Sequence, residues 1–162
     1  MRSMVDWVSA LCDRESLEDA KRRHIANSNI QIADSLKREL ENCVSAYNQR
    51  HAQELPGAAT VNVTGQSTVI LFAIKRTTKP LGHLEIEFQI NEARLTAKGT
   101  GLPKGGATYT IDPEIRDQAF VTTGVLAEAV YFVRGERKHR VPALVSELLS
   151  PLLFPQFCTF PE

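Results

Sequence analysis

Apolar and polar residues alternate without a break over residues 83–90. A repeat of two residues is typical of a β-strand with one face in a core and the other in water. The segment before it, residues 67–76, is largely apolar, and residues 79–82 contain the proline and glycine of a turn. The pattern therefore predicts an antiparallel hairpin at the centre of the structure. Its core-facing residues are expected to be Leu84, Ile86, Phe88 and Ile90.

Further strands are expected on both sides of this hairpin. Alternating or β-branched residues predict them at positions 60–64, 92–98, 107–111 and 137–141, and at both ends of 120–133. The middle of that last segment also fits a helix. Residues 69–72 are apolar on both faces, which predicts a central strand covered by helices. The glycine-rich residues 99–106 predict a hairpin loop.

The N-terminal third shows a helical pattern instead. Residues 4–12 predict a short helix that carries the only tryptophan, Trp7, and docks on the core or on a partner. Residues 16–54, with Ser16 as the N-terminal cap, predict a second helix. Unbroken, it would be about 58 Å long, which exceeds the width of a compact domain of this size. We therefore expect either a break near residues 26–29 or an end that projects and pairs with another chain.

The C-terminal part predicts one more helix. It is expected to begin at Pro142 and to cover residues 143–149, with Pro151 ending or kinking it. An apolar tail, residues 152–157, follows, and we expect it to pack on its own sheet or on a neighbouring subunit. Together these elements predict an α+β fold: N-terminal helices packed on a curved antiparallel sheet of about five to seven strands, closed by a C-terminal helix. One domain, residues 1–162, is expected, divided into a helical segment, a sheet and a helix with its tail. These parts are expected to cover residues 1–55, 58–141 and 142–162.

Composition narrows the classes of protein. Of the 162 residues, 43% are hydrophobic and 23% are charged, as in a globular protein. Basic and acidic residues are equal at 19 each, so no net charge favours nucleic acid as a partner. Three cysteines without a Cys-x-x-Cys pair fit the reducing cytoplasm. No apolar run approaches the roughly 18 residues of a membrane span, so we expect no membrane partner.

The polar side of the central hairpin holds the first candidate site. His83, Glu85 and Glu87 are expected to point the same way, about 7 Å apart from one to the next. One imidazole and two carboxylates are plausible groups for binding a ligand or a metal ion. A metal ion would need a further ligand from another strand, and the candidates for it are His139 and Glu128. The alternative is a solvated sheet face, and we assign no metal site.

The second candidate is the basic cluster Arg134, Arg137, Lys138 and Arg140. On a hairpin, alternate residues face the same way, so three of these charges could share one side with Tyr131. Such a side could contact an anion or a nucleic acid. The alternative is an edge hairpin whose charges block edge-to-edge pairing.

No catalytic motif is present, and the glycine-rich loop lacks the serine or threonine that follows lysine in a phosphate loop. We assign no catalytic residue and no cofactor, and the absence of motifs favours a non-enzymatic role while leaving the enzyme question open. The leading hypothesis is a cytoplasmic interaction or scaffold protein that forms a homo-oligomer, in the simplest case a homodimer, through its long helix or apolar tail. One alternative is a small-molecule binding protein, or an enzyme, with an apolar pocket between helix and sheet. The other is an anion or nucleic-acid contact through the basic cluster.

Overall fold

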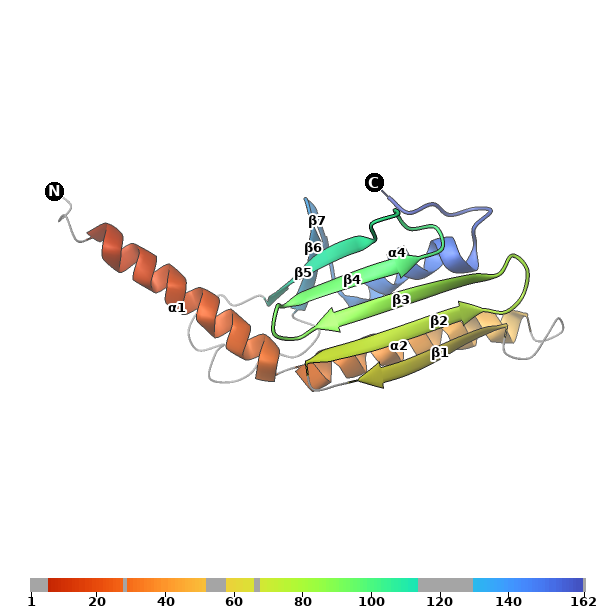
Figure 1. Cartoon of the computed structure of the whole chain (residues 1–162), viewed down its shortest axis with the longest axis horizontal. Helices are drawn as coiled ribbons and strands as arrows, with labels where there is room; N and C mark the ends of the chain where they lie inside the picture. The colour runs from red at the N-terminus through yellow and green to blue at the C-terminus, as the bar shows by residue number, and fades with distance from the viewer. Residues whose placement is uncertain (1–5, 28, 52–57, 66–67, 114–129, 162) are drawn as a thin grey trace.

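The computed structural model describes residues 6–27, 29–51, 58–65, 68–113 and 130–161. Its centre is a seven-stranded sheet in which every strand pairs antiparallel with the next one in sequence (Figure 1). This arrangement, with N-terminal helices and a C-terminal helix, confirms the predicted α+β class. The strands are Ala59–Gly65 (β1), Val69–Arg76 (β2), Gly82–Gln89 (β3), Arg94–Gly99 (β4), Ala107–Pro113 (β5), Val130–Arg134 (β6) and Arg137–His139 (β7). The described helices are Asp6–Asn27 (α1), Asn29–Arg50 (α2) and Val141–Leu153 (α4).

The hairpin of β2 and β3 forms as predicted, and it buries the predicted face of β3. Phe72 pairs with Ile86 and Ile74 pairs with Leu84, and all four side chains are fully buried. Phe88, one step further along β3, is buried as well. The alternation read from the sequence therefore identifies the core face of the sheet.

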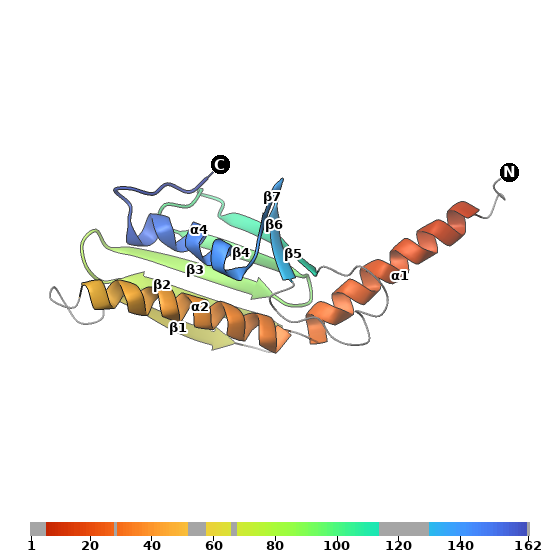
Figure 2. The same ribbon diagram turned by 180° about the vertical axis from the view of Figure 1, so that it is seen from behind.

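Helices α2 and α4 lie side by side on that core face (Figure 2). The stripe on α2 is buried at intervals of three and four residues, and α4 buries a denser stripe of leucine and valine. The side chain of Asn48 fixes α2 to the edge strand. It donates to the carbonyl of Ala59 (2.9 Å) and accepts from the N–H of the same residue (2.8 Å). The buried stripe of α2 consists of Ile32, Leu36, Leu40, Val44 and Tyr47.

Helix α1 joins into one helix two segments that were predicted as separate helices, residues 4–12 and the part of residues 16–54 before the break. It runs unbroken through Ser16, which is therefore an interior residue and not a cap. No glycine or proline interrupts this stretch, and a serine inside a helix costs only a fraction of a kcal/mol. The break falls near Asn27, inside the predicted segment, and α1 also projects from the body of the molecule (Figure 1). Near the junction α1 is held by the buried Ile25.

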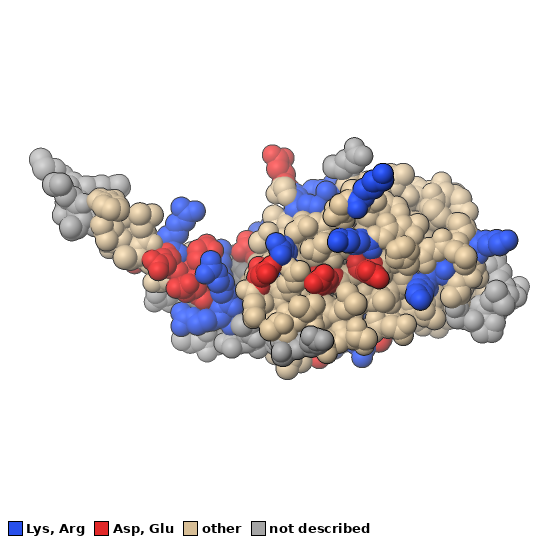
Figure 3. Space-filling view, viewed as in Figure 1, with Lys and Arg blue, Asp and Glu red and all other residues tan. Residues whose placement is uncertain are grey.

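Two further expectations are corrected. The first is that helices cover both faces of β2. Both α2 and α4 lie on the same face of the sheet, and Leu71 on the other face is 36% exposed. Charged side chains of both signs are scattered over this open face (Figure 3), where β3 and β4 place Glu85 opposite Lys98. Of the two effects predicted for Pro151, ending the helix is wrong, because α4 continues to Leu153. The burial of residues 151–153 offsets the hydrogen bond that proline removes.

The predictions for residues 114–129, which include Glu128, fall outside the described residues. Within the described part of the chain, no helix combines the length and the apolar character that a membrane span requires.

Candidate functional site

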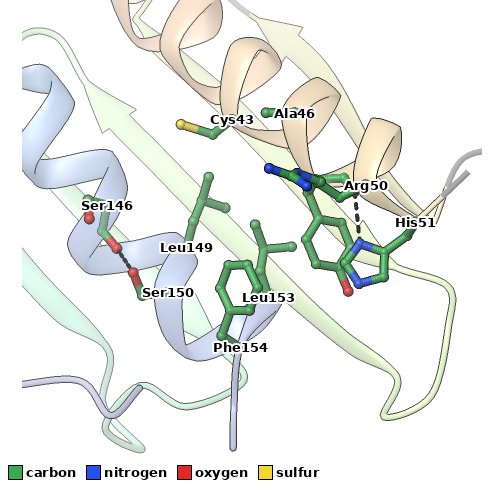
Figure 4. Close-up of a pocket in the computed structure, with 10 residues that line it drawn as sticks. Cys43, Ala46, Arg50, His51, Ser146, Leu149, Ser150, Leu153 and Phe154 are labelled. Carbon is green, nitrogen blue, oxygen red and sulfur yellow. Dashed lines mark hydrogen bonds between the residues drawn. The ribbon is translucent and has the colours of Figure 1, made fainter. Parts of the chain in front are cut away.

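A groove of about 420 Å³ runs between α2 and α4 (Figure 4). Its floor is apolar and buried, formed by Tyr47, Leu149 and Leu153. Its rim includes the exposed side chains of Ala46 and Phe154. A volume of this size is typical of sites that hold a small ligand or a few side chains. The groove lies between two helices, not between a helix and the sheet.

Aromatic packing holds one end of the groove in place. The Tyr47 ring stacks on His51, with ring centroids 4.2 Å apart, and meets the edge of Phe154 at 5.6 Å. Arg76 lies 5.9 Å from the Tyr47 ring and donates to the carbonyl of Leu153, the last residue of α4, at 3.2 Å. Because these contacts join β2, α2 and α4, the groove is largely preformed.

The same end of the groove is basic. Arg50 extends from α2 over the groove (Figure 4), and His51 follows it. None of the ten described residues that line the groove is an aspartate or a glutamate. At the other end, burial raises the pKa of the Cys43 thiol, and the nearby carboxylate of Glu39 raises it further. The groove therefore suits an apolar group that carries negative charge beside Arg50.

The free end of α1 carries unpartnered apolar surface. We call residues 6–13 the α1 tip. Trp7 is 65% exposed, Leu11 53% and Val8 40%, and at about 100° per residue they fall on one third of the helix circumference. Asp6 and Asp13 bound this patch, and no basic residue lies between them. The tip thus combines an apolar face with a net negative charge.

A buried carboxylate lies on the other side of α4. Glu147, whose side chain is only 4% exposed, accepts bonds from Arg137 at 2.8 and 3.0 Å and from the Tyr109 hydroxyl at 2.6 Å. His139 Nε2 lies 3.1 Å from the same carboxylate without hydrogen-bond alignment. Burial, and secondly the bond to Glu147, raise the pKa of the Tyr109 hydroxyl. With its charge paired in this way, the carboxylate joins β5 and β7 to α4.

The predicted basic cluster is divided between the two faces of the hairpin of β6 and β7. Gly135, at φ 60°, opens the expected two-residue turn, and Arg134 pairs with Arg137 across it. Both arginines face α4 and the tail, where Arg134 donates to the carbonyl of Pro161 at 2.6 Å. On the opposite face, Lys138 and Arg140 lie 4.2 and 5.2 Å from the ring of Tyr131. Two of the four charges therefore share a side with this aromatic ring.

The predicted ligand residues of β3 lie on the open sheet face. His83 and Glu85 are exposed and Glu87 is half-buried. In the register, Glu87 is opposite Thr96 and His83 is opposite Lys75. Among the described residues, no group of three or more histidine, cysteine and acidic side chains is arranged to hold a metal ion.

The groove and the buried carboxylate were not among the predicted sites. Glu147 had a sequence signal, since it lies three residues after Leu144 in the apolar stripe of α4, where a charge needs a partner. The groove depends on how closely two helices far apart in sequence approach each other, for which the sequence holds no comparable signal.

Comparison with known proteins adds no relative, because no family model, curated protein or solved structure matches the chain.

Proposed function

We propose that this chain is an interaction protein that self-associates through the α1 tip. The observation that supports this is the exposure of Trp7 and Leu11 at the end of a helix that projects from the body (Figure 1). Every described side chain between residues 6 and 19 is exposed. A projecting helix with an apolar patch is a common form of protein interface.

The negative charge of the tip makes a protein partner more fitting than a membrane surface. Helices that lie on membranes carry lysine and arginine beside their apolar face. Here the flanking residues are Asp6 and Asp13. The described cysteines, Cys12, Cys43 and Cys158, are free thiols, and we place the protein in the reducing cytoplasm.

Light scattering on a size-exclusion column tests the proposal. The wild type should show twice the 18.0 kDa mass of one chain at micromolar concentration. Trp7→Ala should weaken the dimer strongly. An exposure of 65% leaves on the order of 150 Å² of tryptophan in water, and hot-spot truncation typically costs about 2 kcal/mol. Two arms in a symmetric dimer give about 4 kcal/mol, or a dissociation constant roughly a thousandfold higher.

Leu17→Ala is the matched control. Leu17 is 40% exposed on the same helix but lies ten residues after Trp7, about 15 Å further along α1 and outside the tip. This variant should keep the mass of the wild type. Wild-type protein that remains a monomer at these concentrations would refute the proposal.

Binding of a small apolar molecule is the second candidate function, supported by the volume and the apolar floor of the groove. The environment-sensitive dye ANS is a suitable probe. Its fluorescence should rise with the wild type and stay low with Ala46→Trp, which fills the groove. Equal dye binding by both proteins would argue against this function.

A further inference from the structure

We infer that the groove between α2 and α4 is the binding site for the α1 tip of a second copy of this chain, so that two copies exchange their arms. The inference rests on the proposed self-association and adds the place where each arm binds. Four features of the described residues carry it: reach, length, charge and direction.

The tip cannot reach the groove of its own chain. Trp7 is 18 residues from the buried Ile25, which places it about 27 Å from the body along α1. The groove begins at Cys43, 14 residues beyond Asn29, or about 21 Å along α2. In Figures 1 and 2, α1 runs toward the junction and α2 continues from it in broadly the same direction, so the free end of α1 and the C-terminal end of α2 lie on opposite sides of the junction. The occupant must therefore come from another molecule.

The tip and the groove agree in length. The groove follows α2 from Cys43 to His51 and α4 from Ser146 to Phe154, which is eight residues or about 12 Å on each helix. The tip, residues 6–13, covers about 10.5 Å. Its apolar face can thus lie along the whole floor.

The charges are complementary at the Arg50 end of the groove, whereas at the Cys43 end Asp13 comes near the carboxylate of Glu39, which lies 3.7 Å from the Cys43 thiol. The tip has two aspartates and no basic residue, whereas the lining of the groove has Arg50 and His51 and no acidic residue. If α1 lies antiparallel to α2 of the partner, Asp6 comes to the Arg50 end of the groove and Cys12 comes to the Cys43 end. Opposite charges at the end of an apolar contact select the partner and its direction.

Helix dipoles favour the same direction. The C-terminal ends of α2 and α4 both lie at the Arg50 end of the groove, and carry partial negative charge. The N-terminus of α1 carries partial positive charge, so the antiparallel placement puts unlike ends together. A two-fold axis perpendicular to the helices also generates this placement, because α1 and α2 of one chain run in broadly the same direction. One closed dimer can therefore fill both grooves.

The native cysteines provide the test, because Cys12 is on the tip and Cys43 lines the groove. In a Cys158→Ser background, a short bismaleimide should give a covalent dimer. Adding Cys12→Ser or Cys43→Ser should abolish it. A mixture of these two variants should restore the link, which can then only join different copies. Since Cys43 is half-buried and its pKa is raised, the exposed position Ala46→Cys in the Cys43→Ser chain serves as a second acceptor.

Every outcome decides between the claims. A link from Cys12 to Cys43, or to the thiol introduced by Ala46→Cys, supports the inference. A dimer by light scattering that links only through two copies of Cys12, or not at all from Cys12 to either groove position, overturns it and leaves self-association standing. A wild-type monomer overturns the proposed function as well.

A charge exchange gives an independent test. Asp6→Lys and Arg50→Glu should each raise the dissociation constant of the dimer about tenfold, since a two-fold dimer contains the pair of Asp6 and Arg50 twice. The double variant should recover most of this loss. Additive weakening in the double variant would show that the two residues do not meet.

Discussion

Arg137→Ala should destabilise the fold, because Arg137 supplies both guanidinium bonds of the buried Glu147. Removing one partner of a buried ion pair typically costs about 3–5 kcal/mol. The side chain of Arg137 is 44% exposed while that of Glu147 is 4% exposed, so water can replace part of the interaction. We therefore expect a loss of about 2–3 kcal/mol in the free energy of unfolding. For a chain of this size the melting temperature should fall by roughly 4–10 °C.

Urea unfolding followed by circular dichroism measures this difference. Lys138→Ala is the matched control, since Lys138 is the next residue but lies on the opposite face, over Tyr131. It should cost less than about 1 kcal/mol. The double variant Arg137→Ala with Glu147→Gln should be more stable than Arg137→Ala alone, because the amide is uncharged and still accepts the Tyr109 hydroxyl. If both alanine variants unfold at the same urea concentration as the wild type, the buried ion pair does not hold β7 to α4.

Three further predictions follow from the described contacts. Above pH 10 the unfolding free energy should fall by up to about 1.4 kcal/mol per pH unit, because the raised pKa of Tyr109 keeps the folded hydroxyl neutral while the unfolded one ionises. Tyr109→Phe should flatten this part of the pH profile. Asn48→Ala should cost about 1–3 kcal/mol in a denaturation experiment, since it removes both bonds to Ala59; a loss within error would show that α2 does not need this attachment. At protein concentrations low enough to keep the chain monomeric, iodoacetamide at pH 8 should label the exposed Cys12 before Cys43, as read by mass spectrometry of peptides, and the reverse order would contradict the raised pKa.

The sheet could be predicted from the sequence because its signals are local. The alternation from His83 to Ile90 marks one core face, and a slip of one residue in the hairpin would turn Phe72 and Ile74 away from that face. The turn at Gly135 was predictable for the same reason, since a two-residue turn needs positive φ. Local period and turn chemistry therefore account for most of the sheet.

The candidate site could not be predicted in this way. The apolar residues of β2 suggested helices on both sides, but Leu71 lies on the open face. The division of the basic cluster was accessible in principle, since Arg137 and Lys138 must point to opposite faces of a strand. The groove, in contrast, arises from the approach of α2 to α4, and the outward direction of α1 depends on the junction near Asn27. These are tertiary features without a local sequence pattern.

Trp7 is the only tryptophan in the chain, so its fluorescence reports directly on the α1 tip. The emission should shift to shorter wavelength as the protein concentration rises, in step with the doubling of mass seen by light scattering, because the indole moves from water into the groove of the partner. Leu11→Asp, which keeps the tryptophan, should remain at the long-wavelength emission over the same range. An emission maximum that stays constant while the mass doubles would contradict the account, since the dimer would then form through another surface.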